Sequence, residues 1–384
     1  MAHKLNPAAA IIILLLLLPA PQPALGQPAP TPAAAHSDHT SWQWRQPPFI
    51  IVWGFDGYPY VKPFSALLAW GGPNDSILYS QTMDQDVSPY PAGLNRSYDQ
   101  GLSWEHLPFD FDGNVMASLV VHPITPTIIL AGGEGLYYPG GLYRSSDGGE
   151  TWQNLLPATE IGDIEVDPTN ANRIYATTSV GIYRSYDYGE TWSWISSQWL
   201  EDIEVHPTQP NVLFGARFYT TNSYEGVYRS DDWGETWTQV AFLGGKKRIL
   251  IDPTQPDRIF AYRGGLDSYG SIYRSKDSGQ TWEDVSAGLP YVVTDPSVAS
   301  AAIDPRDGAL WVGLTYSGIY VSSNYGDTWA EANNGIPFFG GGVFGPSCDF
   351  IAISSDRDFA VNCSGRLYVK PSVKTLFLPL ITRR

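Results

Sequence analysis

Apolar and polar residues alternate in short runs along most of this chain, and turns rich in Gly, Pro, Asn and Asp separate the runs. Residues 202–207 (DIEVHP), 211–216 (NVLFGA), 225–230 (EGVYRS) and 235–240 (ETWTQV) are four consecutive examples. Alternation with a period of two is typical of a β-strand with one buried face. No stretch keeps the period of an amphipathic helix, so the pattern predicts an almost entirely β protein.

Groups of four such strands repeat, and one motif recurs between the third and fourth strands of a group. Its usual Asp returns every 40 to 48 residues in the copies RSYDQGLSW (96–104), RSSDGGETW (144–152), RSYDYGETW (184–192), RSDDWGETW (229–237), RSKDSGQTW (274–282) and VSSNYGDTW (321–329). Repeats of this length predict a β-propeller, in which each sheet is a blade that covers its neighbours. Seven groups predict seven blades, or six if the first or last group is incomplete.

The last group, residues 348–370, lacks the motif and provides only three strands. Its fourth strand therefore has to come from elsewhere in the chain. Two segments have the apolar character of a strand, namely residues 48–55 (PFIIVWGF) and residues 372–381 (SVKTLFLPLI). A strand from the N-terminal segment would close the ring.

The repeated motif has the residue types that a tight hairpin needs. Its carboxylate or amide can accept backbone N–H bonds, its Gly can adopt a positive φ, and its Trp can place a large apolar ring between blades. We therefore expect a structural role for Asp99, Asp147, Asp187, Asp232, Asp277, Asn324, Trp104, Trp152, Trp192, Trp237, Trp282 and Trp329.

These motif copies resemble the Asp-box, or BNR repeat, of sialidase-type propellers. The repeat also occurs in sortilin-like ectodomains, in xyloglucan-cleaving glycoside hydrolases and in photosystem II assembly factors. The resemblance covers nearly the whole chain after its N-terminal segment. It implies that the boxes lie on the face opposite the ligand site and serve the structure, not catalysis.

The N-terminus has the plan of a secretory signal peptide. Lys4 precedes an apolar run from Ala8 to Leu18, and small residues follow as far as Gly26. The run is too short to span a bilayer, so we expect cleavage after Gly26, no transmembrane anchor afterwards, and a secreted or cell-surface protein. The expected division is a signal peptide at 1–26, a Pro- and Ala-rich linker at 27–42, a propeller at 43–376 and a tail at 377–384.

The formal net charge of −16 argues against a nucleic-acid partner, because such affinity comes from Lys and Arg that neutralise phosphates. His36 and His39 lie in the linker, and no metal-binding motif accompanies them. We therefore expect no cofactor and no metal site, and a monomeric protein.

Cys348 and Cys363 are the two cysteines of the sequence. The segment between them reads as two strands joined by a turn at Ser355 and Asp356, a register that places the two thiols opposite each other. In an exported chain this predicts a cross-strand disulfide; two buried free thiols are the alternative.

Loops opposite the boxes combine aromatic residues, Gly and scattered carboxylates, a composition suited to a sugar ring or to a protein surface. We expect ligand contacts from Arg217, Arg248, Arg263, Tyr137, Tyr138, Tyr219 and Tyr224. Three arginines on adjacent blades would also suit the carboxylate of a sialic acid. However, the Arg-Ile-Pro motif of the sialidase family is absent from the sequence.

Two inner strands read DIEV and pair Asp163 with Glu165 and Asp202 with Glu204. Paired carboxylates can act as acid and base on a glycosidic bond, so Glu165, Glu204 and Asp202 are the catalytic candidates if the protein is a glycoside hydrolase. The other interpretation is that Arg248, neighbouring amides or water satisfy these groups. The favoured function is a non-catalytic recognition or assembly propeller that binds a glycan or an extracellular protein.

Overall fold

The computed structural model places the strands of this chain in one compact unit, residues 39–384. It describes residues 43–45, 52–53, 59–60, 68–71, 77–82, 93–99, 102–107, 109, 115–134, 140–157, 159–217, 225–243, 248–262, 271–290, 298–336, 348–353, 359–363 and 366–370. Every regular element in these ranges is a β-strand, which confirms the all-β prediction. No helix of the described part is long and apolar enough to cross a membrane.

The described strands form seven four-stranded antiparallel sheets, numbered here as blades in chain order. Blade one consists of β4 (Leu68–Gly71), β5 (Ile77–Thr82), β6 (Gly93–Ser97) and β7 (Glu105–Leu107). Blade two consists of β8 (Val115–Val121), β9 (Ile129–Glu134), β10 (Gly141–Ser145) and β11 (Gln153–Pro157). Blade three consists of β12 (Ile161–Val166), β13 (Ile174–Thr178), β14 (Gly181–Ser185) and β15 (Ser193–Ser196).

The later blades follow the same plan. Blade four consists of β16 (Asp202–Val205), β17 (Leu213–Arg217), β18 (Gly226–Ser230) and β19 (Thr238–Ala241). Blade five consists of β20 (Arg248–Ile251), β21 (Ile259–Tyr262), β22 (Tyr273–Ser275) and β23 (Glu283–Asp284). Blade six consists of β24 (Val298–Ile303), β25 (Leu310–Leu314), β26 (Gly318–Ser322) and β27 (Ala330–Glu331).

Blade seven joins the two ends of the unit. Its strands are β28 (Cys348–Ile353), β29 (Phe359–Cys363), β30 (Arg366–Lys370) and the N-terminal β1 (Gln43–Arg45), in the order β1-β30-β29-β28. The closing strand is thus N-terminal but precedes residues 48–55, so the predicted segment is wrong. Part of that segment instead forms β2 (Val52–Trp53), which pairs with β3 (Pro59–Tyr60) in a separate hairpin. The alternative, residues 372–381, lies outside the described residues.

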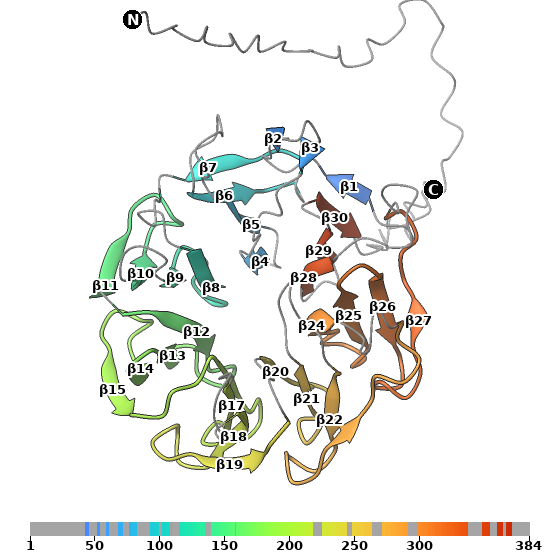
Figure 1. The fold of residues 1–384 in the computed structure, drawn as a ribbon. Coiled ribbons are helices and arrows are strands. Elements are labelled where there is room, and N and C mark those ends of the chain that lie inside the picture. Colours follow the sequence, from blue (N-terminus) through green and yellow to red (C-terminus); the bar gives the residue numbers. More distant parts are fainter. Residues whose placement is uncertain are drawn as a thin grey trace, which may run out of the picture. The chain divides into compact units, whose positions relative to one another are not determined.

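The blades are arranged as a propeller, with the first strand of each blade innermost (Figure 1). Contacts link neighbouring first strands from β28 through β4, β8, β12 and β16 to β20, and β24 contacts β28. Blades five and six meet through a shared core that includes Phe260 and Val312. The labelled strands β7, β11, β15, β19 and β27 lie at the rim (Figure 1).

Hydrophobic cores lie between blades, and five of the six described ones include the motif Trp of the later blade. Trp192 of blade three, for example, packs on a cluster that contains Leu130 of blade two and Ile174 of its own blade. The other four shared cores contain Trp152, Trp237, Trp282 and Trp329. Burial of a large aromatic ring stabilises such a seam by roughly 1.5–3 kcal/mol.

A disulfide joins Cys348 and Cys363 in blade seven. The two residues are register partners in β28 and β29, and both side chains are buried. The bond therefore links the first two strands of the blade that closes the ring, where the sequence analysis expects it.

Candidate functional site

The six box turns, defined here as the motif copies of blades one to six, share one hydrogen-bond arrangement. In blade three, Asp187 accepts hydrogen bonds from the Ser185 hydroxyl at 2.7 Å and from the Thr191 backbone N–H at 2.8 Å. Ser185 Oγ in turn accepts the Gly189 N–H at 2.9 Å. The two contacts of Asp187 recur at Asp99, Asp147, Asp232, Asp277 and Asn324.

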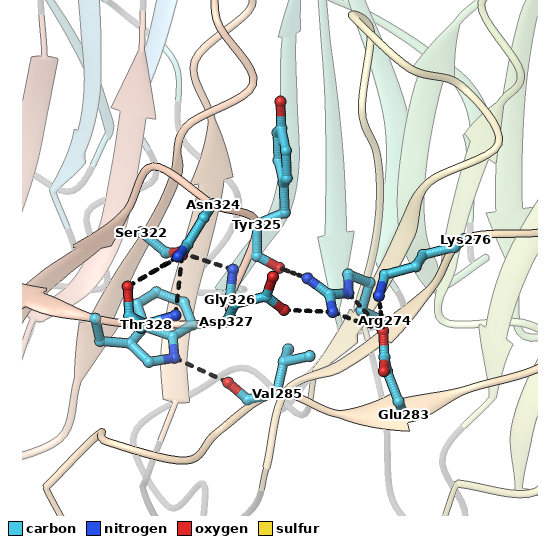
Figure 2. A network of polar contacts seen from close by, with 11 residues as sticks. Arg274, Lys276, Glu283, Val285, Ser322, Asn324, Tyr325, Gly326, Asp327 and Thr328 are labelled. Atoms are coloured by element: carbon cyan, nitrogen blue, oxygen red, sulfur yellow. Dashed lines mark hydrogen bonds and ion pairs between the residues drawn. The ribbon is translucent and has the colours of Figure 1, made fainter.

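The carboxylates of the box turns are held in their charged form. Hydrogen bonds from Thr151 lower the pKa of Asp147 to about 2, and those from Thr281 do the same for Asp277. Asn324 keeps the arrangement without charge, because its Oδ1 accepts the Thr328 N–H and its Nδ2 donates to Thr328 Oγ1 (Figure 2). The carboxylates are thus occupied by their own hairpins and are not poised for chemistry.

An arginine from the third strand of one blade reaches the box turn of the next blade. Arg274 Nη1 donates to the Tyr325 carbonyl at 2.7 Å, and its Nη2 lies 2.6 Å from both Asp327 and Glu283 (Figure 2). Equivalent bonds run from Arg96 to Gly148, Arg144 to Tyr188, Arg184 to Trp233 and Arg229 to Ser278. We call these five contacts the arginine clasps.

The residue that accepts each clasp has a left-handed backbone. Its φ is +78° at Gly148, +60° at Tyr188, +68° at Trp233, +54° at Ser278 and +65° at Tyr325. A positive φ is unfavourable for residues other than Gly, so the clasp and the box hydrogen bonds offset a local strain. The clasps were not predicted from the sequence, although their arginine is the first residue of five motif copies.

At the centre of the ring, polar side chains from the first strands fasten neighbouring blades. Ser118 Oγ accepts the Ile164 N–H at 3.1 Å and donates to Asp163 Oδ1 at 3.1 Å. Asp163 Oδ2 then accepts the Ile203 N–H at 3.3 Å. Each accepted amide belongs to the following blade, so the bonds run from blade two to three and from three to four.

Hydrogen bonds of the same kind join blade four to blade five and blade five to blade six. Asp202 Oδ2 accepts the Ile249 N–H at 2.7 Å, while Arg248 Nη1 donates to Asp202 Oδ1 at 2.8 Å. The backbone of Ala301 in blade six hydrogen-bonds the Tyr262 hydroxyl. The side chain of Asp202 is 5% exposed and that of Arg248 36%, so the ion pair is largely enclosed.

Glu165 and Glu204 complete this central carboxylate cluster. Glu165 is hydrogen-bonded by the backbone of Val205 in the next blade. Burial, reinforced by the neighbouring carboxylates, raises the pKa of both glutamates, and burial with the charge of Asp202 raises the pKa of Asp163 to about 7. Carboxyls with such raised pKa values retain protons well above the pH at which an ordinary carboxyl ionises.

Two arginines of the predicted ligand site are described, and they contact different partners. Arg248 lies in the central cluster with Asp202, whereas Arg217 ends β17 with its guanidinium 5.1 Å from the ring centre of Trp199. Arg263, Tyr137, Tyr138, Tyr219 and Tyr224 lie outside the described residues. Trp199 itself was not among the predicted contacts, although it lies in the link between blades three and four.

Metal ligation has no support in the described part of the chain, which holds no group of three or more His, Cys, Asp or Glu arranged to bind an ion. His36 and His39 fall outside the described residues.

Known proteins of three groups resemble this chain. The sequence profile described as "Sortilin, neurotensin receptor 3" matches residues 225–339, which is less than half of the chain. No curated protein matches the sequence. The fold resembles that of the GH74 xyloglucanase from Xanthomonas campestris, with a TM-score of 0.55 and 18% identity over 75% of this chain and 49% of that enzyme.

Two structures of YCF48 match over nearly their whole length. YCF48 from Cyanidioschyzon merolae gives a TM-score of 0.56 and 12% identity, and covers 88% of this chain and 100% of its own. YCF48 bound to D1 peptide gives a TM-score of 0.54 and 16% identity, and covers 83% of this chain and 99% of its own. The fold is a β-propeller similar to that of YCF48. The propeller spans about half the length of the GH74 enzyme and nearly the full length of YCF48.

Proposed function

We propose that this propeller is an exported, non-catalytic binding protein, and that it holds a protein partner on the face opposite the box turns. One observation carries the proposal: two of the three carboxylates that a glycoside hydrolase could use, Asp202 and Glu165, are engaged in joining blades. Both oxygens of Asp202 have donors, Arg248 and the Ile249 N–H. Glu165 is hydrogen-bonded by the backbone of Val205. Hydrolysis needs two carboxyl groups that face the glycosidic bond, and Glu204 alone cannot supply both.

The box-turn face is occupied in a similar way. The arginine clasps and the box hydrogen bonds hold its hairpins to one another, so few polar groups there remain for a partner. The opposite face carries the turns between second and third strands and the links between blades. Trp199 with Arg217, and Tyr316 at 48% exposure, lie there. Aromatic residues and arginine are enriched at energetically important positions of protein interfaces.

The relatives support a protein partner more than a glycan. Full-length agreement with YCF48, seen in one structure with a bound peptide, fits a single propeller that binds unaided. The GH74 enzyme contains about as much chain again beyond the matched part. A glycan remains the alternative ligand for the same aromatic residues.

The test compares three readouts on the purified protein: capture of partners from the native envelope after crosslinking, binding to immobilised glycans, and release of reducing sugar. We expect partner capture without sugar release. The Trp199→Ala/Arg217→Ala variant should lose the captured partner, whereas Leu102→Glu, which introduces the residue that three of the other five motif copies have there, should retain it. Sugar release that Glu204→Gln abolishes would overturn the proposal. Glycan binding that the double variant loses would show that the ligand is a glycan and not a protein.

A further inference from the structure

The outermost strands of the blades differ in how they are protected. An outer strand exposes backbone N–H and C=O groups, and proteins commonly guard such edges with charged residues or proline. Blades one, five and six carry Glu105, Glu283 with Asp284, and Glu331 on these strands, and β11 ends at Pro157. Strand β15 reads Ser-Trp-Ile-Ser and carries neither charge nor proline.

The side chains beside β15 make this edge apolar as well as unguarded. Trp194, in the middle of the strand, is 52% exposed, and Val180 in the adjoining turn is 58% exposed. Trp194 Nε1 donates to the Val180 carbonyl at 3.2 Å, so the two residues are held together. Strand β19 is also uncharged, but its exposed residues are Thr238 and Gln239.

Acidic residues lie at both ends of this apolar strip. Exposed Glu190 precedes β15 by three positions in the box turn. At the other end, exposed Glu160 lies beside the turn that holds Val180, since its carbonyl accepts the Ser179 N–H at 3.0 Å. An apolar strand with basic residues at its two ends would complement this arrangement in both shape and charge.

We propose that the edge of blade three, formed by β15 with Trp194 and Val180, is a docking strip for an extended segment of a partner protein. The segment pairs with β15 as a fifth strand, its alternate apolar side chains pack on Trp194 and Val180, and its flanking Lys or Arg residues approach Glu160 and Glu190. The free edge supplies backbone hydrogen bonds that only an extended chain can accept in series. This strip lies along the outer strand of blade three and reaches the loop face at Val180, whereas the site of the proposed function contains Trp199 and Arg217.

The experiment uses the whole protein and a fluorescent peptide, Lys-Lys-Val-Thr-Val-Thr-Val-Lys-Lys, with anisotropy for affinity and hydrogen exchange for position. We expect the peptide to slow exchange in residues 193–196. Trp194→Glu should weaken binding by about tenfold or more, as loss of a central aromatic contact does. The matched change Leu102→Glu, at an exposed apolar residue of blade one, should leave affinity unchanged. A peptide with Glu in place of Lys should bind at least about tenfold more weakly at low salt.

Three outcomes would overturn the proposal. The first is no protection of residues 193–196 at saturating peptide. The second is equal loss of binding in Trp194→Glu and Leu102→Glu, which would indicate adsorption to exposed apolar residues in general. The third is a dimer in sedimentation velocity that Trp194→Glu dissociates, which would assign the strip to a second copy of the chain. If the Trp199→Ala/Arg217→Ala variant keeps its captured partner, only the proposed function is contradicted, and the docking strip is not.

Discussion

Single residues of the box turns combine several contacts, and the sixth copy shows which of them need a charge. Asp187 and Asn324 both accept a serine hydroxyl and the backbone N–H four residues later. Only the hydroxyl of the following threonine is treated differently, because Asn324 donates to Thr328 Oγ1 where Asp187 accepts from Thr191. The turn therefore requires an acceptor oxygen more than a negative charge.

Replacement of Asp187 should distinguish these two requirements. Asp187→Ala removes the acceptor for Ser185 and Thr191 and should lower the free energy of unfolding by about 1 kcal/mol, since the turn is partly open to water. Asp187→Asn should cost less than half as much. Urea denaturation of both variants measures the difference. An alanine variant as stable as the asparagine variant would contradict the argument.

Residue types predict these turns well because the requirements are local. Asp or Asn, Gly and Trp each follow from the geometry of one hairpin, so the sequence alone suffices to assign them. The left-handed φ of Tyr188, Trp233, Ser278 and Tyr325 could not be predicted, because their side chains do not favour it. That conformation depends on an arginine supplied by the preceding blade, and such a contact is visible only once the blades are placed side by side.

At the scale of strands, the clasps explain why the motif changes where it does. Each motif arginine lies in the third strand of a blade whose successor has a box turn. The sixth copy has Val321 instead, and the next blade takes its third and fourth strands, β30 and β1, from opposite ends of the unit. No hairpin joins those strands, so an arginine at position 321 would have no box carbonyl to bind.

The clasp relation predicts that substitutions at Arg274 and Val321, which are equivalent positions of the motif, differ in their effect on stability. Arg274→Met keeps the apolar stem but leaves the Tyr325 carbonyl without its donor, and should cost about 1–3 kcal/mol of unfolding free energy. Its partners Glu283 and Asp327 are about half exposed and remain solvated. Val321→Arg should bring no gain, because it also disturbs the apolar packing around Ile319. Both values come from urea denaturation, and a stabilising Val321→Arg would contradict the clasp relation.

The first strands carry ionisable groups that change stability with pH in the opposite direction to the box-turn carboxylates. Asp163, with a pKa raised to about 7, and the two glutamates bind protons more tightly in the folded chain. Their unfolded pKa is near 4, so the folded state holds extra protons between about pH 4 and 7 and stability falls as pH rises. The box carboxylates, with lowered pKa values, lose stability as pH falls from about 4 towards 2.

Stability should therefore be greatest near about pH 4–5. Glu204→Gln imitates the protonated side chain, so it should be more stable than the parent at pH 8, by a margin that narrows as pH falls and vanishes below about pH 4. Urea midpoints across this range measure the effect, with the exposed Glu190→Gln as the control that leaves the profile unchanged. A parent protein with a flat profile from pH 5 to 8 would contradict the assignment. This central cluster was partly predictable: the DIEV repeats revealed the carboxylates, and Arg248 and neighbouring amides were named as possible partners, but the sequence did not show that these amides belong to the next blade.

At the scale of the whole unit, stability depends on how the ring closes. Every other blade is a continuous meander, whereas blade seven uses β1, with Trp44 in register with Tyr368 of β30. The count of repeats predicted that a strand must come from elsewhere, because the last group was one strand short. Its identity was missed because β1 contains only three residues, Gln-Trp-Arg, and lacks the apolar run of residues 48–55.

Two N-terminal deletions should distinguish the contribution of β1 to ring closure from that of the residues before it. A chain that begins at residue 39 keeps β1 and the whole compact unit of residues 39–384, and should match the full protein in urea midpoint. A chain that begins at residue 46 leaves the edge of β30 unpaired and blade seven with three strands. It should lose several kcal/mol, since pairing and packing of the closing strand are removed together, and its transition should broaden as the ring opens from that blade. Equal midpoints and slopes for the two truncated chains would show that β1 does not hold the ring closed.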